Sequence, residues 1–343
     1  MSDIIKVALI GFGGIARMHY AAYRSLIADG SAVRVVAVVD KNAAQFKSNM
    51  RINLGSVDAT LDKSVHTYTD IDELIRTEEF DVADVCLPSF LHKDAAVKLM
   101  RAGKHVICEK PMALNYADCL EMLDASRTAG VRLMIGQCLR FESAYVFLKQ
   151  CCDDGRFGPL RYMSMARLSE YPTWSSDGWF NDKKKCGGCI IDTHVHDVDF
   201  VRFLLGDPDR VSCVTFDNIP KCQLVNTRLF YGDLAVVIDA AWDDSLPKKF
   251  EAKYAAKFDR ASVYFDGNIV MIYPAEGKPY LATITEDDSV KEEISYFLNL
   301  VKDKDAENTY NTPESAAGSI RLTEILLESA DAGGKEIKIE KQI

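Results

Sequence analysis

The feature that most constrains this fold is a glycine-rich turn near the start of the chain, between an apolar run and a helical pattern. Residues 4–10 are apolar apart from Lys6, which is typical of a buried parallel strand. Residues 15–28 then show the apolar spacing of a helix. A strand, a tight turn and a helix in this order begin a βαβ unit, so we expect a parallel sheet. The turn consists of Gly11, Phe12, Gly13, Gly14, Ile15 and Ala16.

The same alternation of strand and helix patterns continues through the first third of the chain. Further strand patterns occur at 33–39, 82–87, 105–108 and 131–135, and helical patterns occur at 91–102 and 115–128. Alternation at this pitch predicts right-handed βαβ units and a doubly wound parallel sheet, an α/β Rossmann domain. We place this domain at residues 1–125.

The pattern changes after about residue 140 and becomes rich in strands. Strand patterns at 210–216, 224–230 and 234–242 are separated by short connections, which favours an antiparallel sheet. One helix is expected over 189–205. Another is expected over about 312–332, with Thr312 as its N-cap. We therefore predict a second, α+β domain at residues 126–343.

Composition excludes several classes of protein. Of the 343 residues 48% are apolar and 27% charged, with a net charge of −10, so we expect binding neither to nucleic acid nor to anionic membranes. No apolar run approaches the length of about 18 residues that a membrane span needs. No export signal is visible, so a cytoplasmic protein with reduced thiols is expected. Cys186 and Cys189 form one C-x-x-C pair, interpreted as a glycine turn flanked by thiols, with a redox pair as the alternative and no zinc ribbon.

The glycine-rich turn has the form G-x-G-x-x-A, which is a variant of the dinucleotide-binding fingerprint. Gly11 allows the tight turn, Gly13 lets the backbone approach a pyrophosphate, and Ala16 lets the helix pack on the strand. Asp40 ends the second strand, where a carboxylate binds the ribose hydroxyls of NAD and repels the phosphate of NADP. We therefore predict NAD in preference to NADP, although Lys41 is near. The alternatives are a structural turn and a solvated aspartate.

Two charged clusters are candidates for chemistry. Glu109-Lys110-Pro111 follows a strand at the sheet edge where ligands gather, and a lysine there can stabilise negative charge on a reacting oxygen. The alternative is a surface salt bridge at a turn. Asp192, His196 and Asp199 share one face if their segment is helical, and an imidazole oriented by a carboxylate suits a general base. The alternatives are a solvated face and a metal site using His194, which we disfavour because residues two apart point to different faces of a helix.

These motifs together resemble those of the glucose–fructose oxidoreductase/inositol dehydrogenase (Gfo/Idh/MocA) family. The resemblance covers nearly the whole chain, and its segments are 11–16, 87–92, 102–111, 136–141 and 187–199. It implies a Rossmann domain and a second domain with a large open, mainly antiparallel sheet. It also implies that the C-terminal helix packs on the Rossmann domain and that the sheet forms homodimers or homotetramers.

The resemblance further implies which residues act. Lys110, Asp192 and His196 are expected to be catalytic. Besides the glycine turn and Asp40, the cofactor is expected to contact Leu87, Pro88, His92, Glu109 and Lys110. Substrate contacts are expected from Arg140, Trp174 and His194, and no metal is expected. The aromatic residues of 171–180 are equally consistent with a wall that stacks on a sugar and with a loop packed on the sheet.

The function implied is hydride transfer between a nicotinamide and a secondary alcohol or ketone of a sugar, polyol or derivative. One alternative is chemistry in which a retained NAD assists glycoside cleavage or epimerisation. A second is a regulator that binds NAD(P) without turnover, which the complete set of Lys110, Asp192 and His196 disfavours.

Overall fold

The computed structural model describes residues 4–47, 51–52, 55–56, 60–173, 175, 177–247, 249–285 and 288–340. Contacts within the chain divide it into two units. The first contains the chain up to residue 138 with 184–186 and 288–318, and the second contains 139–183, 187–287 and the chain from 319 onwards. The strand Leu133–Gly136 thus falls in the first unit, beyond the boundary predicted at residue 125.

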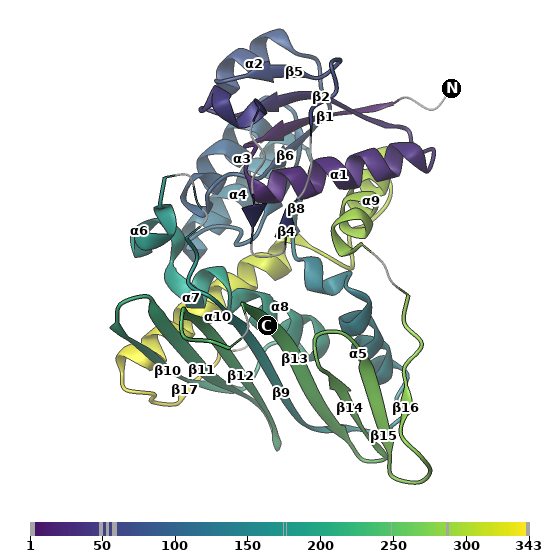
Figure 1. Cartoon of the computed structure of the whole chain (residues 1–343), viewed down its shortest axis with the longest axis vertical. Coiled ribbons are helices and arrows are strands. Elements are labelled where there is room, and N and C mark those ends of the chain that lie inside the picture. Colours follow the sequence, from purple (N-terminus) through teal and green to yellow (C-terminus); the bar gives the residue numbers. More distant parts are fainter. Residues whose placement is uncertain are drawn as a thin grey trace. The chain divides into compact units, whose positions relative to one another are not determined.

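Within the described residues, the first unit is built on a six-stranded sheet in the order β5-β2-β1-β6-β7-β8 (Figure 1). All of its neighbouring strands pair in parallel. The strands are β1 (Ile5–Ile10), β2 (Val33–Val39), β5 (His66–Tyr68), β6 (Val82–Val85), β7 (His105–Glu109) and β8 (Leu133–Gly136). The chain order reverses at the β1/β6 pair, which is where doubly wound sheets bind ligands. The predicted Rossmann architecture is confirmed.

Helices cover this sheet. They are α1 (Gly14–Ala28), α2 (Ile71–Thr77), α3 (His92–Arg101), α4 (Tyr116–Ala129) and α9 (Ser289–Lys302). Short elements complete the unit: η1 (Ala43–Lys47), β3 (Arg51–Ile52), β4 (Gly55–Ser56) and η2 (Ser89–Leu91). Helix α9 was not predicted. It contributes Ile294 and Phe297 to the core around Tyr20 and Tyr23 of α1, so a late segment completes the first hydrophobic core.

The second unit is built, within the described residues, on a nine-stranded sheet in the order β16-β15-β14-β13-β9-β12-β11-β10-β17 (Figure 1). Among these described strands β9 and β12 pair in parallel and the other neighbours pair antiparallel, so the sheet is mainly antiparallel, as predicted. The strands are β9 (Leu160–Ser169), β10 (Arg210–Ile219), β11 (Cys222–Tyr231), β12 (Leu234–Asp243), β13 (Phe250–Phe258), β14 (Ala261–Phe265), β15 (Val270–Pro274), β16 (Tyr280–Leu281) and β17 (Ile337–Lys338).

The remaining elements include the helices expected to carry chemistry. They are η3 (Cys138–Arg140), α5 (Ser143–Asp153), η4 (Trp179–Asn181), α6 (Lys183–Cys186), α7 (Gly188–Asp192), α8 (Val195–Leu205) and α10 (Pro313–Asp331). The prediction of one continuous helix over 189–205 is wrong, because residues 193 and 194 interrupt the helix between α7 and α8. The hydroxyl of Thr312 accepts the amide of Ser315 at 3.1 Å, so the predicted cap of α10 is confirmed. Residues of α10 up to 318 belong to the first unit and later ones to the second.

None of the helices in the described part of the chain is both long enough and apolar enough to cross a membrane.

Candidate active site

The glycine turn after β1 has the geometry that a bound phosphate requires. Gly11 has φ +93°, and a Cβ atom there would lie 2.8 Å from the carbonyl oxygen of Cys86, so only glycine fits. A Cβ atom built on Gly13 would meet nothing within 4 Å, so the backbone there is open to an approaching group. Helix α1 begins at Gly14. Its first amides therefore face an open site with a partial positive charge, which suits the pyrophosphate of a dinucleotide.

Asp40 lies directly against this turn. It follows β2 and is partly exposed. Its Oδ2 accepts the backbone N–H of Phe12 at 2.9 Å, and its Oδ1 accepts that of Asn42 at 2.8 Å. These bonds fix the carboxylate beside the turn, where it can accept ribose hydroxyls. Together with the glycine cradle, this arrangement fits NAD, whose adenosine ribose carries two such hydroxyls.

The other residues of the turn mainly pack. The Phe12 ring is fully buried, lies edge-on to Tyr20 and has the guanidinium of Arg17 4.5 Å above it. Ala16 is also fully buried. Ile15 packs against the core cluster of the unit. Of these residues, only backbone atoms are suited to contact a cofactor, because their side chains face the core.

His92 joins the two loops that follow β6 and β7. Its Nδ1 lies 2.8 Å from the carbonyl oxygen of Pro111, and its Nε2 lies 2.7 Å from that of Leu87. The side chain is buried, and this burial lowers its pKa although both carbonyl contacts oppose the shift. The expected direct contact of His92 with a cofactor is therefore not supported. Its ring instead holds the loops that carry Leu87, Pro88 and Lys110.

Glu109 ends β7 and is held by two contacts. Its Oε1 lies 2.9 Å from Nε2 of His19, and its Oε2 accepts the backbone N–H of Lys110 at 3.0 Å. Burial would raise the pKa of Glu109, but the hydrogen bond and charge of His19 lower it. The alternative of a surface salt bridge at this turn does not describe Glu109, which faces inward. The side chain of Lys110 is partly exposed.

The double glycine before the second cluster is a structural requirement. Gly187 and Gly188 both have φ +74°. A Cβ atom on Gly187 would lie 2.4 Å from Cβ of Ile191, inside helix α7. Glycine therefore lets α7 begin in this tight space. Cys186 and Cys189 are free thiols and both are buried, and this burial favours the glycine turn over a redox pair, whose thiols need to be accessible.

The predicted face of Asp192, His196 and Asp199 is only partly formed. Asp192 ends α7 and His196 lies in the first turn of α8, and both are partly exposed. Asp199 is buried, and Arg140 binds it at 2.9 and 2.8 Å through two nitrogens. The helix breaks at 193–194, between Asp192 and His196, so helical spacing does not place these two residues on one face. Arg140 is itself buried in this pair, so a substrate contact from Arg140 is not supported either.

A second buried pair holds α8 from another side. Arg167 of β9 binds Asp197 at 2.8 and 3.1 Å and also donates to the hydroxyl of Tyr145 at 3.0 Å. Asp197 directly follows His196 in the chain. The backbone that carries His196 is therefore anchored by buried, bidentate ion pairs at 197 and 199. This anchor was not predicted, because two aspartates in a largely apolar helix were its only local signal.

His194 belongs to the core of the second unit. It is fully buried, and its Nε2 lies 3.1 Å from the hydroxyl of Thr227 on β11. Burial, with the nearby charge of Arg167, lowers the pKa of His194 to about 3, so the ring is neutral. The expected substrate contact and the alternative metal site are both unsupported, because the ring points toward the sheet.

The aromatic loop packs on the sheet where it is described. Trp242 of β12 is buried and donates from Nε1 to the hydroxyl of Thr193 at 2.6 Å. Tyr171 and Phe180 are buried, and each lies edge-on to Trp242 with ring centroids 5.7 Å apart. These contacts favour a packed loop over a sugar-stacking wall. Trp174, a predicted substrate residue, lies outside the described residues.

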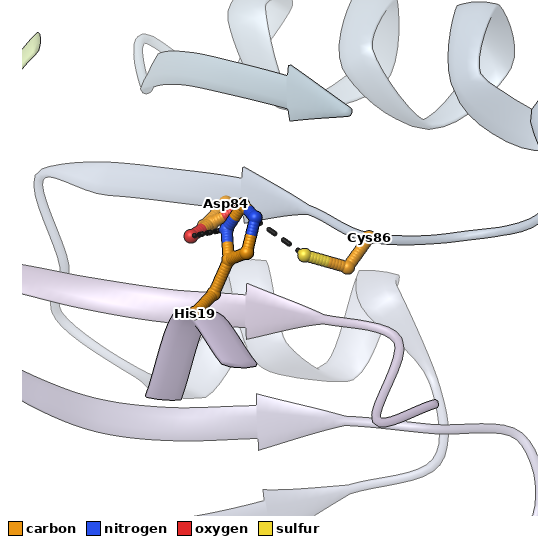
Figure 2. Close-up of side chains that lie close together, drawn as sticks. All are labelled: His19, Asp84 and Cys86. Atoms are coloured by element: carbon orange, nitrogen blue, oxygen red, sulfur yellow. Dashed lines mark hydrogen bonds and ion pairs between the residues drawn. The ribbon is translucent and has the colours of Figure 1, made fainter. Parts of the chain in front are cut away.

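One polar cluster of the first unit was not predicted. His19, Asp84 and Cys86 are buried with their ligand-type atoms within 4.8 Å of one another (Figure 2). An aspartate inside the apolar strand Val82–Val85 was the signal that could have indicated it. Burying an unpaired carboxylate is costly, so a partner must lie close.

Comparison with known proteins agrees with this geometry. Residues 5–137 match the family model described as an oxidoreductase family with an NAD-binding Rossmann fold. Residues 145–247 match the GFO/IDH/MocA C-terminal domain. The chain belongs to the GFO/IDH/MocA oxidoreductase family. The family resemblance noted in the sequence is therefore confirmed for both the Rossmann domain and the C-terminal domain.

Individual relatives are more distant. An inositol 2-dehydrogenase of Salmonella paratyphi B is 30% identical over 65% of this chain and 60% of its own length. A 2,7-anhydro-N-acetylneuraminate hydratase of Mediterraneibacter gnavus is 30% identical over 61% of this chain and 53% of its own. The chain thus matches little more than half the length of these relatives. A levoglucosan dehydrogenase bound to NADH and levoglucosan has the same fold, with a TM-score of 0.83, 16% identity and coverage of 98% and 100% of the two chains.

Proposed function

We propose that this protein is an NAD-dependent dehydrogenase that oxidises a secondary alcohol of a sugar, polyol or related compound, or reduces the matching ketone. The observation that carries the proposal is the glycine cradle with Asp40 beside it, in a chain whose other domain presents Asp192 and His196 at its surface. The names of the inositol and levoglucosan dehydrogenases support the substrate class.

Three side chains have separate roles in the proposed reaction. The glycine turn and Asp40 would hold NAD, which would supply the acceptor for the hydride of the carbon that carries the hydroxyl. His196 accepts the hydroxyl proton, because imidazole titrates near neutral pH and the ring is partly exposed. Lys110 donates a hydrogen bond to the same oxygen and stabilises its developing negative charge. Asp192, at the end of α7 and four residues before His196, orients the substrate hydroxyl.

A substrate screen tests the function. The purified protein is mixed with NAD and a panel of inositols, aldoses, sugar acids and anhydrosugars, and formation of NADH is followed by absorbance. We expect NADH to form with one chemical class. NAD binding without NADH, over the whole panel, would contradict a dehydrogenase.

One other chemistry has a specific observation in its favour. The Mediterraneibacter gnavus relative is named a hydratase, a reaction without net oxidation. If NAD is retained and recycled within each turnover, substrate disappears while no NADH accumulates. Chromatography of the panel reactions, run beside the absorbance assay, separates the two proposals.

Asp40 should set the preference for NAD. Asp40→Asn keeps an oxygen that can accept the Phe12 amide but removes the charge that repels a 2′-phosphate. We expect the ratio of kcat/KM for NAD to that for NADP to fall about tenfold or more. Asp72→Asn, an exposed aspartate paired with Lys98 on the same unit, is the control and should leave the ratio unchanged. An unchanged ratio in Asp40→Asn would show that the charge of Asp40 does not set the preference for NAD.

We also infer that the protein forms homo-oligomers through the second sheet. Large apolar side chains are exposed on its strands and alternate with buried ones, so they share one face of the sheet with exposed charged residues such as Arg228 and Lys257. The exposed apolar side chains are Tyr162, Val214, Phe216, Leu224, Tyr264 and Tyr273. Sedimentation should find a dimer or tetramer in the native protein and a smaller species in Phe216→Ser/Tyr264→Ser. A native monomer would contradict the inference.

A reducing, cytoplasmic setting is part of the same proposal. The buried thiols of Cys86, Cys108 and Cys119 support it, because such thiols persist in reduced proteins.

A further inference from the structure

A buried imidazole in the first unit is bound by two carboxylates. His19 on α1 has Nδ1 at 3.1 and 2.9 Å from the two oxygens of Asp84 and Nε2 at 2.9 Å from Oε1 of Glu109. His19 and Asp84 are 2% and 0% exposed, so water does not screen the contact. Figure 2 shows the ring lying between Asp84 and Cys86. Both ring nitrogens face carboxylate oxygens, which only the doubly protonated ring can satisfy as a donor.

The charges in the cluster agree with an imidazolium. Burial would lower the pKa of His19, but the charge of Asp84 and its hydrogen bond raise it well above the ordinary value. The Cys86 thiol donates to Oδ1 of Asp84 at 3.3 Å, and burial raises its pKa, so it stays protonated. Two carboxylates thus share one cation.

The distances favour this ion pair over a metal site. Nitrogen and oxygen ligands of a tetrahedral metal lie about 3.3 Å or more apart, because each is about 2.0–2.2 Å from the ion. The closest contact from His19 to Asp84 is 2.9 Å, which is a direct hydrogen bond. The second nitrogen of His19 is already bound to Glu109.

The contact reaches the loop that carries the proposed catalytic lysine. Nε2 of His19 binds Oε1 of Glu109, and the backbone amide of Lys110 donates a hydrogen bond of 3.0 Å to Oε2 of the same carboxylate. A Cβ atom on Gly136 would lie 3.3 Å from Oε1 of Glu109, so the carboxylate fits closely against β8. The rotamer of Glu109 is therefore fixed on both sides, and with it the point at which the Lys110 backbone leaves β7.

We propose that His19 is a positioning residue for the reaction: its cation, anchored on Asp84, holds Glu109 and thereby fixes the backbone of Lys110 in the orientation that places its ammonium on the substrate oxygen. The inference rests on the proposed function for the role of Lys110. Its geometric part, from His19 to the Lys110 amide, does not.

The test separates positioning from stability. His19→Gln leaves Asp84 buried without its cation and is expected to destabilise the fold. His19→Leu/Asp84→Val removes both members of the pair and fills the space with apolar groups, so no unpaired charge is left at position 84 and most of the thermal stability should return. Glu109 still lacks its partner in this double variant. Leu74→Ala, a change at a buried residue of α2, which packs on β2 and β5, is the control for destabilisation alone.

Three quantities are measured on each variant: the melting temperature, the Kd for NAD and the kcat. Positioning predicts that the double variant melts close to the native protein, binds NAD within about threefold, and has a kcat lowered about 10- to 100-fold, as expected for a misplaced catalytic group. If His19 only stabilises the fold, the kcat of the double variant should return to the native value together with its melting temperature. That result would overturn the proposal.

Hydrogen exchange decides the geometric part without any substrate. The amide of Lys110 should exchange faster in both His19 variants and at the native rate in Leu74→Ala, measured in the protein without NAD. Native exchange at Lys110 in the double variant would also overturn the proposal. Lys110→Met tests the proposed function independently: full activity in that variant would refute the role of Lys110 while leaving the exchange result to stand on its own.

Discussion

Replacing His196 by alanine should lower kcat by about 10²- to 10⁴-fold, the usual contribution of a general base, while the Kd for NAD stays within about twofold. The side chain is partly exposed in the first turn of α8, whereas the residues on either side of it, Val195 and Asp197, are buried. Its removal therefore takes away a proton acceptor without opening the core. Steady-state kinetics and a fluorescence titration of NAD measure the two quantities.

His194 supplies the matched control. It lies two residues before His196, but it is buried against Thr227. His194→Asn keeps a polar group of similar reach, so we expect reduced stability and a kcat within about tenfold of the native value. If His194→Asn lost as much kcat as His196→Ala, the assignment of the base to His196 would be wrong.

Replacing Asp197 by alanine should destabilise the second unit by about 3–5 kcal/mol, because Arg167 then remains buried without its carboxylate. The pair is bidentate at 2.8 and 3.1 Å, and its side chains are 7% and 0% exposed. Urea unfolding gives the free energy, and a shift in the midpoint without a change in slope identifies a loss of stability.

The double variant Arg167→Met/Asp197→Leu tests whether the unpaired charge of Arg167 causes this loss of stability. It removes both charges together, so most of the stability lost in Asp197→Ala should return. Arg161 and Asp259 form an exposed pair on the same sheet, and Asp259→Ala should cost at most about 1 kcal/mol. Equal losses at the buried and exposed pairs would contradict the anchoring role given to Arg167 and Asp197.

Local patterns were sufficient to predict much of the fold and to identify the residues of a candidate cofactor site. The strands at 33–39 and 82–85, the turn at Gly11 and the carboxylate at Asp40 depend on residues adjacent in the chain. Their signals are apolar periodicity, a requirement for φ > 0 and a strand end. The double glycine at Gly187 was noticed for the same reason, although its clash with Ile191 became visible only in the structure.

The contacts that fix the site could not be predicted, because they join distant residues. His19 and Asp84 are 65 residues apart, Arg140 and Asp199 are 59 apart, and Arg167 and Asp197 are 30 apart. A pattern in one segment does not identify such partners. Helical spacing also could not reveal the break at 193–194, which separates Asp192 from His196 and Asp199.

The central claim, hydride transfer from substrate carbon to NAD, is tested most directly with deuterium. Glucose and inositol deuterated at their ring carbons, with the other positive members of the screen in the same form, are incubated with the protein and NAD, and the reduced nucleotide is analysed by mass spectrometry. We expect one deuterium per NADH, with no transfer by His196→Ala above its residual rate. Product that forms while the nucleotide carries no deuterium would contradict this claim.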